Sequence, residues 1–328
     1  MSKMTSERDV LPLIPVETLN EIIDGVAEQS VALAQFARLP NMSSRTTEMP
    51  VLDSLVDAQF TSGVVVYDDL TYGSDEDGTF TPDTGVPGLK ATGDAKWAKK
   101  KIVAEPIAIV LPIAEDVLAD ADYDIWGELR PRIVEAFGKR IDEAIIWGQG
   151  RPTSWETGIV PTAIARNNVL VEGTGSDFGI DISNLMGLIE EQGFDPTGFI
   201  AEVSTKAKLR NLRSAAGFPL FSGGTMTDPD TLYGHPIHYA KNAAFNKTVA
   251  RLIVGDMQEA KYSIRQDITF KLFTEGVVTD DYGNIVANLM QNDMVALRVV
   301  MRLGWVLPNP IHQLNPNRDG YPFAVMTK

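Results

Sequence analysis

Three consecutive acidic residues, Asp75, Glu76 and Asp77, run into Gly78, and they are the first group in this sequence that could bind a metal ion. An EF-hand calcium loop needs oxygen ligands at positions 1, 3 and 5, a glycine at position 6 and a glutamate at position 12. With Gly78 at position 6, positions 1 and 12 fall on a glycine and a threonine. The spacing therefore predicts no calcium site and favours a solvated polar turn.

The histidines are a second candidate for metal chemistry. His235 and His238 are three residues apart, but Pro236 lies between them and makes helical spacing unfavourable. A zinc site needs at least a third protein ligand, and none follows nearby in the sequence. A metal-dependent hydrolase stays a remote alternative, and its ligands would come from Asp75, Asp77, Asp83, His235 and His238.

Other catalytic patterns are missing. The sequence contains no GxSxG nucleophile elbow and no phosphate loop ending in GK[ST]. The glycines of "WGQGRPTSWETG" follow a predicted helix, whereas a dinucleotide-binding loop precedes one. We therefore predict that the protein is not an enzyme and has no catalytic residues, no cofactor and no metal site.

Composition narrows the class of protein further. The chain of 328 residues carries 29 basic and 44 acidic residues, a net charge of −15, which argues against a nucleic-acid binder. A local basic cluster, Lys96, Lys99, Lys100 and Lys101, is interpreted as a solvated strand edge that could pair with the acidic run. No apolar run is long enough for a membrane helix, and no signal peptide or cysteine is present.

The residue pattern in the first part of the chain predicts an arm. Apolar residues recur at helical spacing from Pro15 to Phe36, and strand-forming residues follow at 49–55 and 61–67. A polar stretch rich in Gly, Pro, Asp and Thr leads into a predicted long strand, Lys96 to Ile113. The strands at 61–67 and 96–113 are predicted to form a hairpin with a connection far longer than usual. Because an isolated hairpin is only marginally stable, this arm must lie on something else.

The rest of the chain alternates helices and strands. The strongest helix is predicted at 124–147, where isoleucine, leucine and phenylalanine recur every four residues before Gly148 ends it. Asp181 and Ser204 are predicted to cap two later helices, and strands with Gly, Asn and Asp turns complete the second half. The fold class is therefore α+β, with a long helix, a mixed sheet and a projecting arm.

The order of these patterns resembles the major capsid proteins of tailed bacteriophages with the Hong Kong ninety-seven-type fold. The resemblance extends over most of the chain and is carried by the succession of several segments. They are "WAKKKIVAEPIAIVLPIAEDVLADADYDI", "ELRPRIVEAFGKRIDEAIIWG", "LRNLRSAAGFPLF", "TLYGHPI", "LIVGDMQEAKYSIRQDI" and "DMVALRVVMRLGWVL".

The resemblance implies a division of the chain into four parts. Residues 1–48 would be an N-terminal arm with an amphipathic helix, and 61–110 an extended two-stranded loop. Residues 49–60 and 111–178 would form a peripheral domain around the spine helix 124–147. Residues 179–328 would form an axial domain, with part of 262–306 returning to the peripheral domain.

The resemblance also implies a function. Copies would assemble as pentamers and hexamers into an icosahedral shell that encloses the phage genome without sequence-specific DNA binding. Intersubunit contacts are expected at Asp75, Glu76, Asp77, Lys96, Lys99, Lys100 and Lys101. The location would be the virion capsid, assembled in the host cytoplasm, with a portal and a separate scaffolding or decoration protein as further partners and no membrane. The main alternative is an encapsulin, a bacterial nanocompartment that carries an enzyme cargo in a shell of the same fold.

Some members of the family crosslink their subunits covalently. They join a lysine of the extended loop to an asparagine near the last long strand, assisted by a glutamate. The sequence offers Lys90, Lys96, Asn288 and Asn292, but Val300 stands where the glutamate would be. Since amide formation then lacks its general base, we predict no crosslinking.

Overall fold

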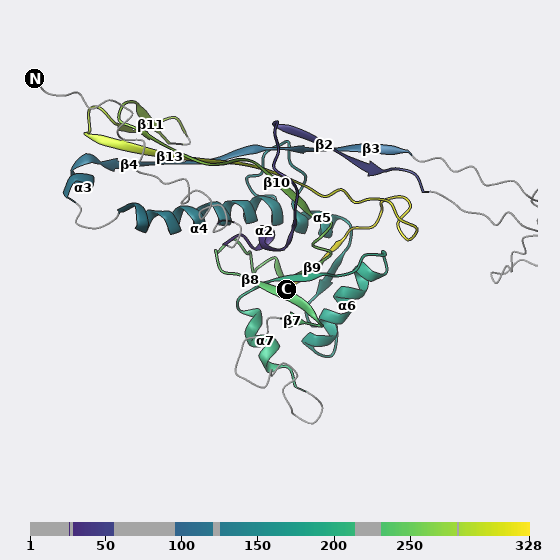
Figure 1. Cartoon of the computed structure of the whole chain (residues 1–328). Coiled ribbons are helices and arrows are strands. Elements are labelled where there is room, and N and C mark those ends of the chain that lie inside the picture. Colours follow the sequence, from purple (N-terminus) through teal and green to yellow (C-terminus); the bar gives the residue numbers. More distant parts are fainter. Residues whose placement is uncertain (1–25, 27–28, 56–95, 121–124, 214–230, 281) are drawn as a thin grey trace, which may run out of the picture.

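The computed structural model describes residues 26, 29–55, 96–120, 125–213, 231–280 and 282–328. These residues form two main sheets with helices packed on them (Figure 1). A four-stranded sheet and a long helix run side by side, and a six-stranded sheet with its own helices lies at one end of them. The α+β fold class with a long helix and mixed sheets is confirmed.

The four-stranded sheet has the order β1-β10-β13-β4. Its strands are β1 (Ala37–Arg38), β4 (Glu105–Ala114), β10 (Lys261–Phe273) and β13 (Met294–Val306). Strand β13 is antiparallel to both β10 and β4, while the short β1 is parallel to β10. Between Leu297 and Leu303 of β13 the odd-numbered residues are buried and the even-numbered ones are not, as expected for a strand with one covered face.

Helix α4 (Ile125–Ile146) covers that face and confirms the predicted long helix. Its buried residues share the helical period and join the core formed with β13: Ile133, Phe137, Ile141 and Ile145. Gly148 follows with a φ of 67°, a left-handed conformation that glycine adopts without steric cost and that commonly ends helices.

The six-stranded sheet has the order β5-β14-β9-β6-β8-β7. Its strands are β5 (Val169–Val171), β6 (Gly198–Glu202), β7 (Thr231–Leu232), β8 (His235–Ala240), β9 (Ala250–Gly255) and β14 (Phe323–Thr327). Helices α6 (Phe178–Glu190) and α7 (Thr205–Asn211) share one hydrophobic core with it. Helices α2 (Val31–Gln35) and α5 (Ile159–Ala165) share the other core with residues of the same sheet and of α4. Both faces of the sheet are therefore covered.

Two predicted helix caps differ in the structure. Helix α6 begins after Asp177, whose carboxylate accepts a hydrogen bond from the Ile180 amide at 2.9 Å, so the cap predicted at Asp181 was wrong. The Asp181 carboxylate lies in the first turn and binds the preceding loop. Ser204 does precede α7, but its hydroxyl donates to Glu202 instead of capping the helix. Several Asp and Ser residues near a helix start compete for this role.

The long strand predicted at 96–113 is in fact two strands. Strand β3 (Trp97–Val103) pairs antiparallel with β2 (Thr46–Leu52), and together they form a two-stranded ribbon. The chain then enters β4, which pairs with β13, so residues 105–110 belong to the four-stranded sheet. The partner that we predicted at 61–67 lies outside the described residues, as does the polar stretch that follows it.

Two smaller features complete the described chain. Strands β11 (Val277–Thr279) and β12 (Ile285–Asn288) form a hairpin between β10 and β13, and α3 (Glu115–Asp120) follows β4. The predicted N-terminal helix is described only near its end, as α2. Among the described helices, none has the length and apolar character needed to span a bilayer. The division of the chain into arm, loop, peripheral and axial parts stays a prediction.

Candidate assembly surfaces

The lysines predicted at intersubunit contacts lie on or beside strand β3. The Lys99 ammonium lies 2.8 Å from the Glu48 carboxylate on β2, and the Lys100 ammonium lies 2.7 Å from Glu156. The Lys99 hydrogen bond and charge lower the pKa of Glu48, and Glu48 in turn raises the pKa of Lys99. Two of the four predicted lysines therefore have an acidic partner within the same chain.

Lys96 and Lys101 lie at the two ends of this lysine row. The Lys96 amide donates to the Ser54 hydroxyl at 2.6 Å, which joins the two strands beyond their last paired residues. Lys101 is exposed and stands opposite Glu48 in the strand register. Asp75, Glu76 and Asp77 lie outside the described residues, so whether the acidic run meets these lysines stays a prediction.

The ribbon has two different faces. On the inner face Val51 and Ile102 are buried, and Ile102 packs in a small core with Met42 and Val306. On the outer face Trp97 is 65% exposed and stands opposite Leu52. Tryptophan is one of the residue types enriched among the hot spots at the centres of protein interfaces. The outer face is thus a candidate contact surface.

Polar contacts fasten the base of the ribbon to the body. The Glu105 carboxylate accepts hydrogen bonds from the Ser154 hydroxyl at 2.7 Å and from Arg45 at 2.9 Å, and these bonds lower its pKa. The indole nitrogen of Trp155 donates to the Val103 carbonyl at 3.1 Å. These contacts fix the direction in which the ribbon leaves the four-stranded sheet.

A second fastening comes from Arg318. Its guanidinium donates to the Leu52 carbonyl at 2.7 Å and forms an ion pair with Asp53 at 2.9 Å. Because Leu52 and Asp53 are at the far end of β2, this arginine holds the ribbon closer to its tip than the Glu105 contacts do. The ribbon is therefore held at both ends of its described length.

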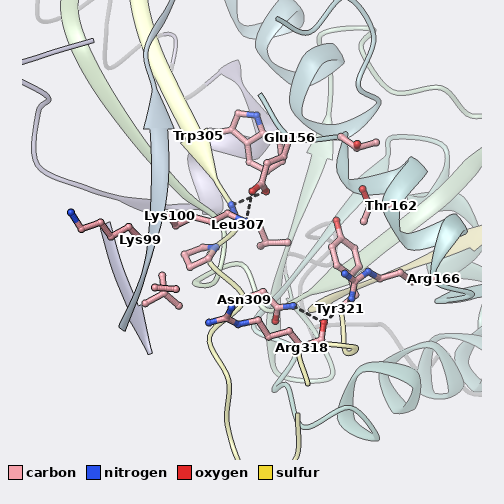
Figure 2. A pocket seen from close by; sticks show the side chains of 14 residues that line it. Lys99, Lys100, Glu156, Thr162, Arg166, Trp305, Leu307, Asn309, Arg318 and Tyr321 are labelled. Carbon is pink, nitrogen blue, oxygen red and sulfur yellow. Dashed lines mark hydrogen bonds and ion pairs between the residues drawn. The ribbon is translucent and has the colours of Figure 1, made fainter. Parts of the chain in front are cut away.

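A cavity of about 410 Å³ lies between the ribbon and the body. Figure 2 shows Lys100 on one side of it and Arg166 and Tyr321 on the other. The Arg166 guanidinium donates to three consecutive carbonyls, those of residues 318–320, at 2.8 to 3.1 Å. Arg166, Arg318 and the two lysines that line the cavity all have acceptors within the chain. The described lining of the cavity is therefore part of the ribbon's support.

Within the described residues, His235 and His238 do not form a metal centre. His235 and His238 are both on β8, where burial lowers the pKa of His238. In the described part of the chain, no three His, Asp or Glu side chains lie close enough to hold one metal ion. Asp75, Asp77 and Asp83, the other proposed ligands, lie outside it.

The residues relevant to crosslinking are partly described. Val300 stands between Thr269 on β10 and Ala108 on β4, so its cross-strand neighbours carry no carboxylate. The Asn288 side-chain amide donates to Gln291 at 2.8 Å. The absence of a crosslink stays a prediction.

Sequence reasoning missed the acidic partners of the lysines, Glu48 and Glu156. No local signal pairs Glu156 with Lys100, because more than fifty positions separate them. Glu48 was missed because the sequence TTEMPVL at 46–52 does not alternate and does not indicate which strand it pairs with, although opposite charges favour cross-strand pairing.

The comparisons with known proteins agree on one family. The model of the phage capsid family matches residues 12–311. The major capsid protein of Staphylococcus phage 80alpha is 28% identical over 216 residues, which cover 65% of this chain and 63% of that protein. The match thus spans less than two thirds of that relative's length.

Solved structures extend the similarity to nearly the whole chain. A protein of Microbacterium phage Oxtober96 is 32% identical, with 98% of both chains covered and a TM-score of 0.73. A protein of Mycobacterium phage Cain is 25% identical, with 99% of this chain and 95% of that chain covered and a TM-score of 0.71. The resemblance noted in the sequence is confirmed, and the encapsulin alternative is not favoured. The chain therefore belongs to the phage capsid family, and it is a structural capsid protein.

Proposed function

We propose that copies of this chain assemble as pentamers and hexamers into an icosahedral shell that encloses a phage genome. The observation that carries this proposal is the ribbon β2–β3, which extends away from both sheets (Figure 1) and leaves Trp97 exposed on its outer face. The body of the same chain covers only the inner face of the ribbon, and a neighbouring copy supplies the surface that its outer face lacks. Membership of the capsid family supports a copy of the same chain as that neighbour.

A closed shell needs several kinds of contact. Rings require head-to-tail surfaces that close, and rings must also contact one another. Many modest interfaces then stabilise the shell together, because losing one contact leaves the others in place. In this assembly the six-stranded sheet is the axial domain that meets its copies around the ring axis.

The charge of the chain suits a container for DNA. A net charge of −15 weakens nonspecific binding of the shell lining to the packaged genome. The protein acts structurally and catalyses no reaction. Assembly takes place in the host cytoplasm, and a portal and a separate scaffolding or decoration protein are its further partners.

The test is to purify the full chain and observe it by negative-stain microscopy and analytical sedimentation. We expect shells, rings or large capsomers. A protein that stays monomeric over a broad range of salt and protein concentration would contradict the proposal.

A matched pair of variants tests the ribbon within the same experiment. Trp97→Ala should lower the yield of assembled particles about thirtyfold or more, because truncating a buried interface tryptophan costs about 2 kcal/mol or more. Leu314→Ala removes a similarly exposed apolar side chain outside the ribbon and should assemble normally. Equal yields for the two variants would show that the ribbon face is not a contact.

A further inference from the structure

The loop between β13 and β14, residues 307–322, contacts the ribbon through Arg318. The Arg318 guanidinium reaches the Leu52 carbonyl and the Asp53 carboxylate at the far end of β2. Arg318 has a φ of 59°. A residue with a Cβ rarely adopts this left-handed conformation, so its surroundings must hold it there. The direction of the Arg318 side chain therefore depends on what fixes its backbone.

Arg166 fixes that backbone from a different part of the fold. It directly follows α5 as the C-cap of that helix. One nitrogen of its guanidinium donates to the carbonyls of residues 318, 319 and 320 at 3.1, 2.8 and 3.0 Å. Three consecutive carbonyl oxygens meet one donor only where the backbone curves sharply, and a residue with positive φ contributes to such a curve. Arg166 and the conformation of this turn therefore depend on each other.

The Arg166 guanidinium is itself held in place. Its central carbon lies 5.6 Å from the centre of the Tyr321 ring, within the range of a cation–aromatic contact. Tyr321 is buried, and its hydroxyl donates to the Ile159 carbonyl at 3.3 Å. The Asn309 side chain gives the turn a second support, because it donates to the Gly320 carbonyl at 3.0 Å. The turn is thus fixed to the body independently of the ribbon.

Arg166 acts at a distance from the ribbon. Among the described residues, its hydrogen bonds go to the turn and none goes to the ribbon. Figure 2 shows Arg166 beside Tyr321, while Arg318 reaches from the same loop toward the ribbon. Arg166 and the ribbon are therefore connected in series, with Arg318 as the connecting residue.

The position of the Arg318 contact on the ribbon matters. A strand rises about 3.3 Å per residue, so Leu52 lies about 20 Å from Thr46, where β2 begins. Over that length a rotation of about 10° at the base moves the far end by about 3 Å. A displacement of that size breaks a hydrogen bond. Arg318 therefore restrains a rotation that contacts nearer the base, such as those of Glu105, restrain less.

We propose that Arg166 is a positioning residue for the ribbon: it holds the backbone of residues 318–320 so that the Arg318 side chain fixes the far end of β2. The consequence of this inference rests on the proposed shell function, because the direction of the ribbon decides where Trp97 meets a neighbouring copy. The positioning itself is a property of the single chain and can be measured without a shell.

The sequence contains no cysteine, so two introduced thiols can carry spin labels at defined positions. Trp97→Cys places one label at the far end of the ribbon, and Glu190→Cys places the other at the end of α6. Pulsed electron spin resonance on the unassembled chain gives the distribution of distances between them. Arg166→Ala should widen this distribution by about 3 Å, the displacement that a rotation of about 10° produces. An unchanged distribution would overturn the proposal.

A second variant tests the connection in series. Arg318→Met keeps a long side chain but removes the bonds to Leu52 and Asp53, so it should widen the distribution as Arg166→Ala does. Because the two residues act in series, the double variant should be no wider than either single variant. Widening that adds up in the double variant would show that Arg166 affects the ribbon by another route, which also overturns the proposal.

Arg213→Ala is the matched control. Arg213 also donates to backbone carbonyls, those of Arg210 and Leu212, but it follows α7, which lies away from the ribbon (Figure 1). Its loss should leave the distribution unchanged, and widening equal to that of Arg166→Ala would count against a specific role of Arg166. Thermal unfolding checks that every variant is folded at the temperature of the measurement.

Arg166→Lys is the conservative variant. An ammonium also offers three donors, so its distribution should lie close to that of the parent chain. A folded lysine variant with a distribution as wide as that of Arg166→Ala would show that the carbonyl bonds do not position the ribbon.

Particle yield separates this inference from the proposed function. In chains without labels, Arg166→Ala should lower the yield of particles and Arg166→Lys should restore it. If the yield falls while the distance distribution stays unchanged, Arg166 does not position the ribbon and the shell function stands. If the parent chain never assembles, the shell function fails, and the spin-label measurement still decides the role of Arg166.

Discussion

At the scale of single residues, Asp142 joins three segments that are distant in the sequence. Its buried carboxylate on α4 accepts hydrogen bonds from the Ser30 hydroxyl at 2.7 Å and from the amides of Val31 and Ala32 at 3.1 Å. The Asn242 side chain donates to it at 2.5 Å. Burial raises the pKa of Asp142, and these hydrogen bonds oppose that shift. One carboxylate thus fixes the start of α2 and the loop after β8 to the long helix.

We predict that Asp142→Ala destabilises the folded subunit by about 3 kcal/mol or more, because it leaves several buried donors without an acceptor. Asp142→Asn should cost less, since the amide keeps one acceptor oxygen. The measurement is thermal unfolding of unassembled protein.

The control for Asp142 is Glu135→Ala on the exposed side of the same helix. Its ion pair with Arg132 is long, at 3.5 Å, and surface pairs of this kind contribute about 0.5 kcal/mol or less. If Asp142→Ala unfolded at the same temperature as Glu135→Ala, the carboxylate would not hold these segments together.

At the scale of elements, the binding partner of the acidic run 75–77 stays a prediction. Lys99 and Lys100 already form ion pairs with Glu48 and Glu156, so neither offers the acidic run an uncompensated positive charge. If the segment docks, its partner cations include others, such as the exposed Lys101. We keep the hypothesis that this segment docks on an adjacent copy.

Reversing the charge of the run tests that hypothesis. With Asp75, Glu76 and Asp77 all changed to lysine, we expect the assembly yield to fall and to depend strongly on salt, because screening weakens repulsion between exposed charges. The measurement is particle yield by sedimentation across a salt series. Changing the exposed Glu190, the last residue of α6, and the exposed Glu191 that follows it to lysine is the control, and an equal loss in both variants would count against a specific contact.

Local sequence signals predicted some elements and not others. The helix at 125–146 was predictable because its core residues repeat at the helical period and a glycine ends it. The pairing of β3 with β2 was not predictable, because any two strands of similar pattern can pair. Only packing in the folded protein selects one partner. The bulge at Val286 between β11 and β12 was missed for a related reason, because it depends on strand register, which the sequence pattern does not show.

At the scale of the whole molecule, we expect subunits to be held without covalent bonds. Val300 lies among residues that offer no carboxylate to act as a base for amide formation. Assembled particles heated in denaturant should therefore run as a single monomer band on a gel. A ladder of multimers would contradict this prediction and would locate a base elsewhere in the shell.

Strand β14 occupies an inner position of the six-stranded sheet, between β5 and β9, although it is the last of these three strands in the sequence. While the chain is being synthesised, β5 and β9 have no common neighbour until residues 323–327 have left the ribosome. The sheet therefore closes late, and a translation product that stops short of β14 keeps a split sheet with two unpaired edges. Such a fragment would lack the native surface of this sheet.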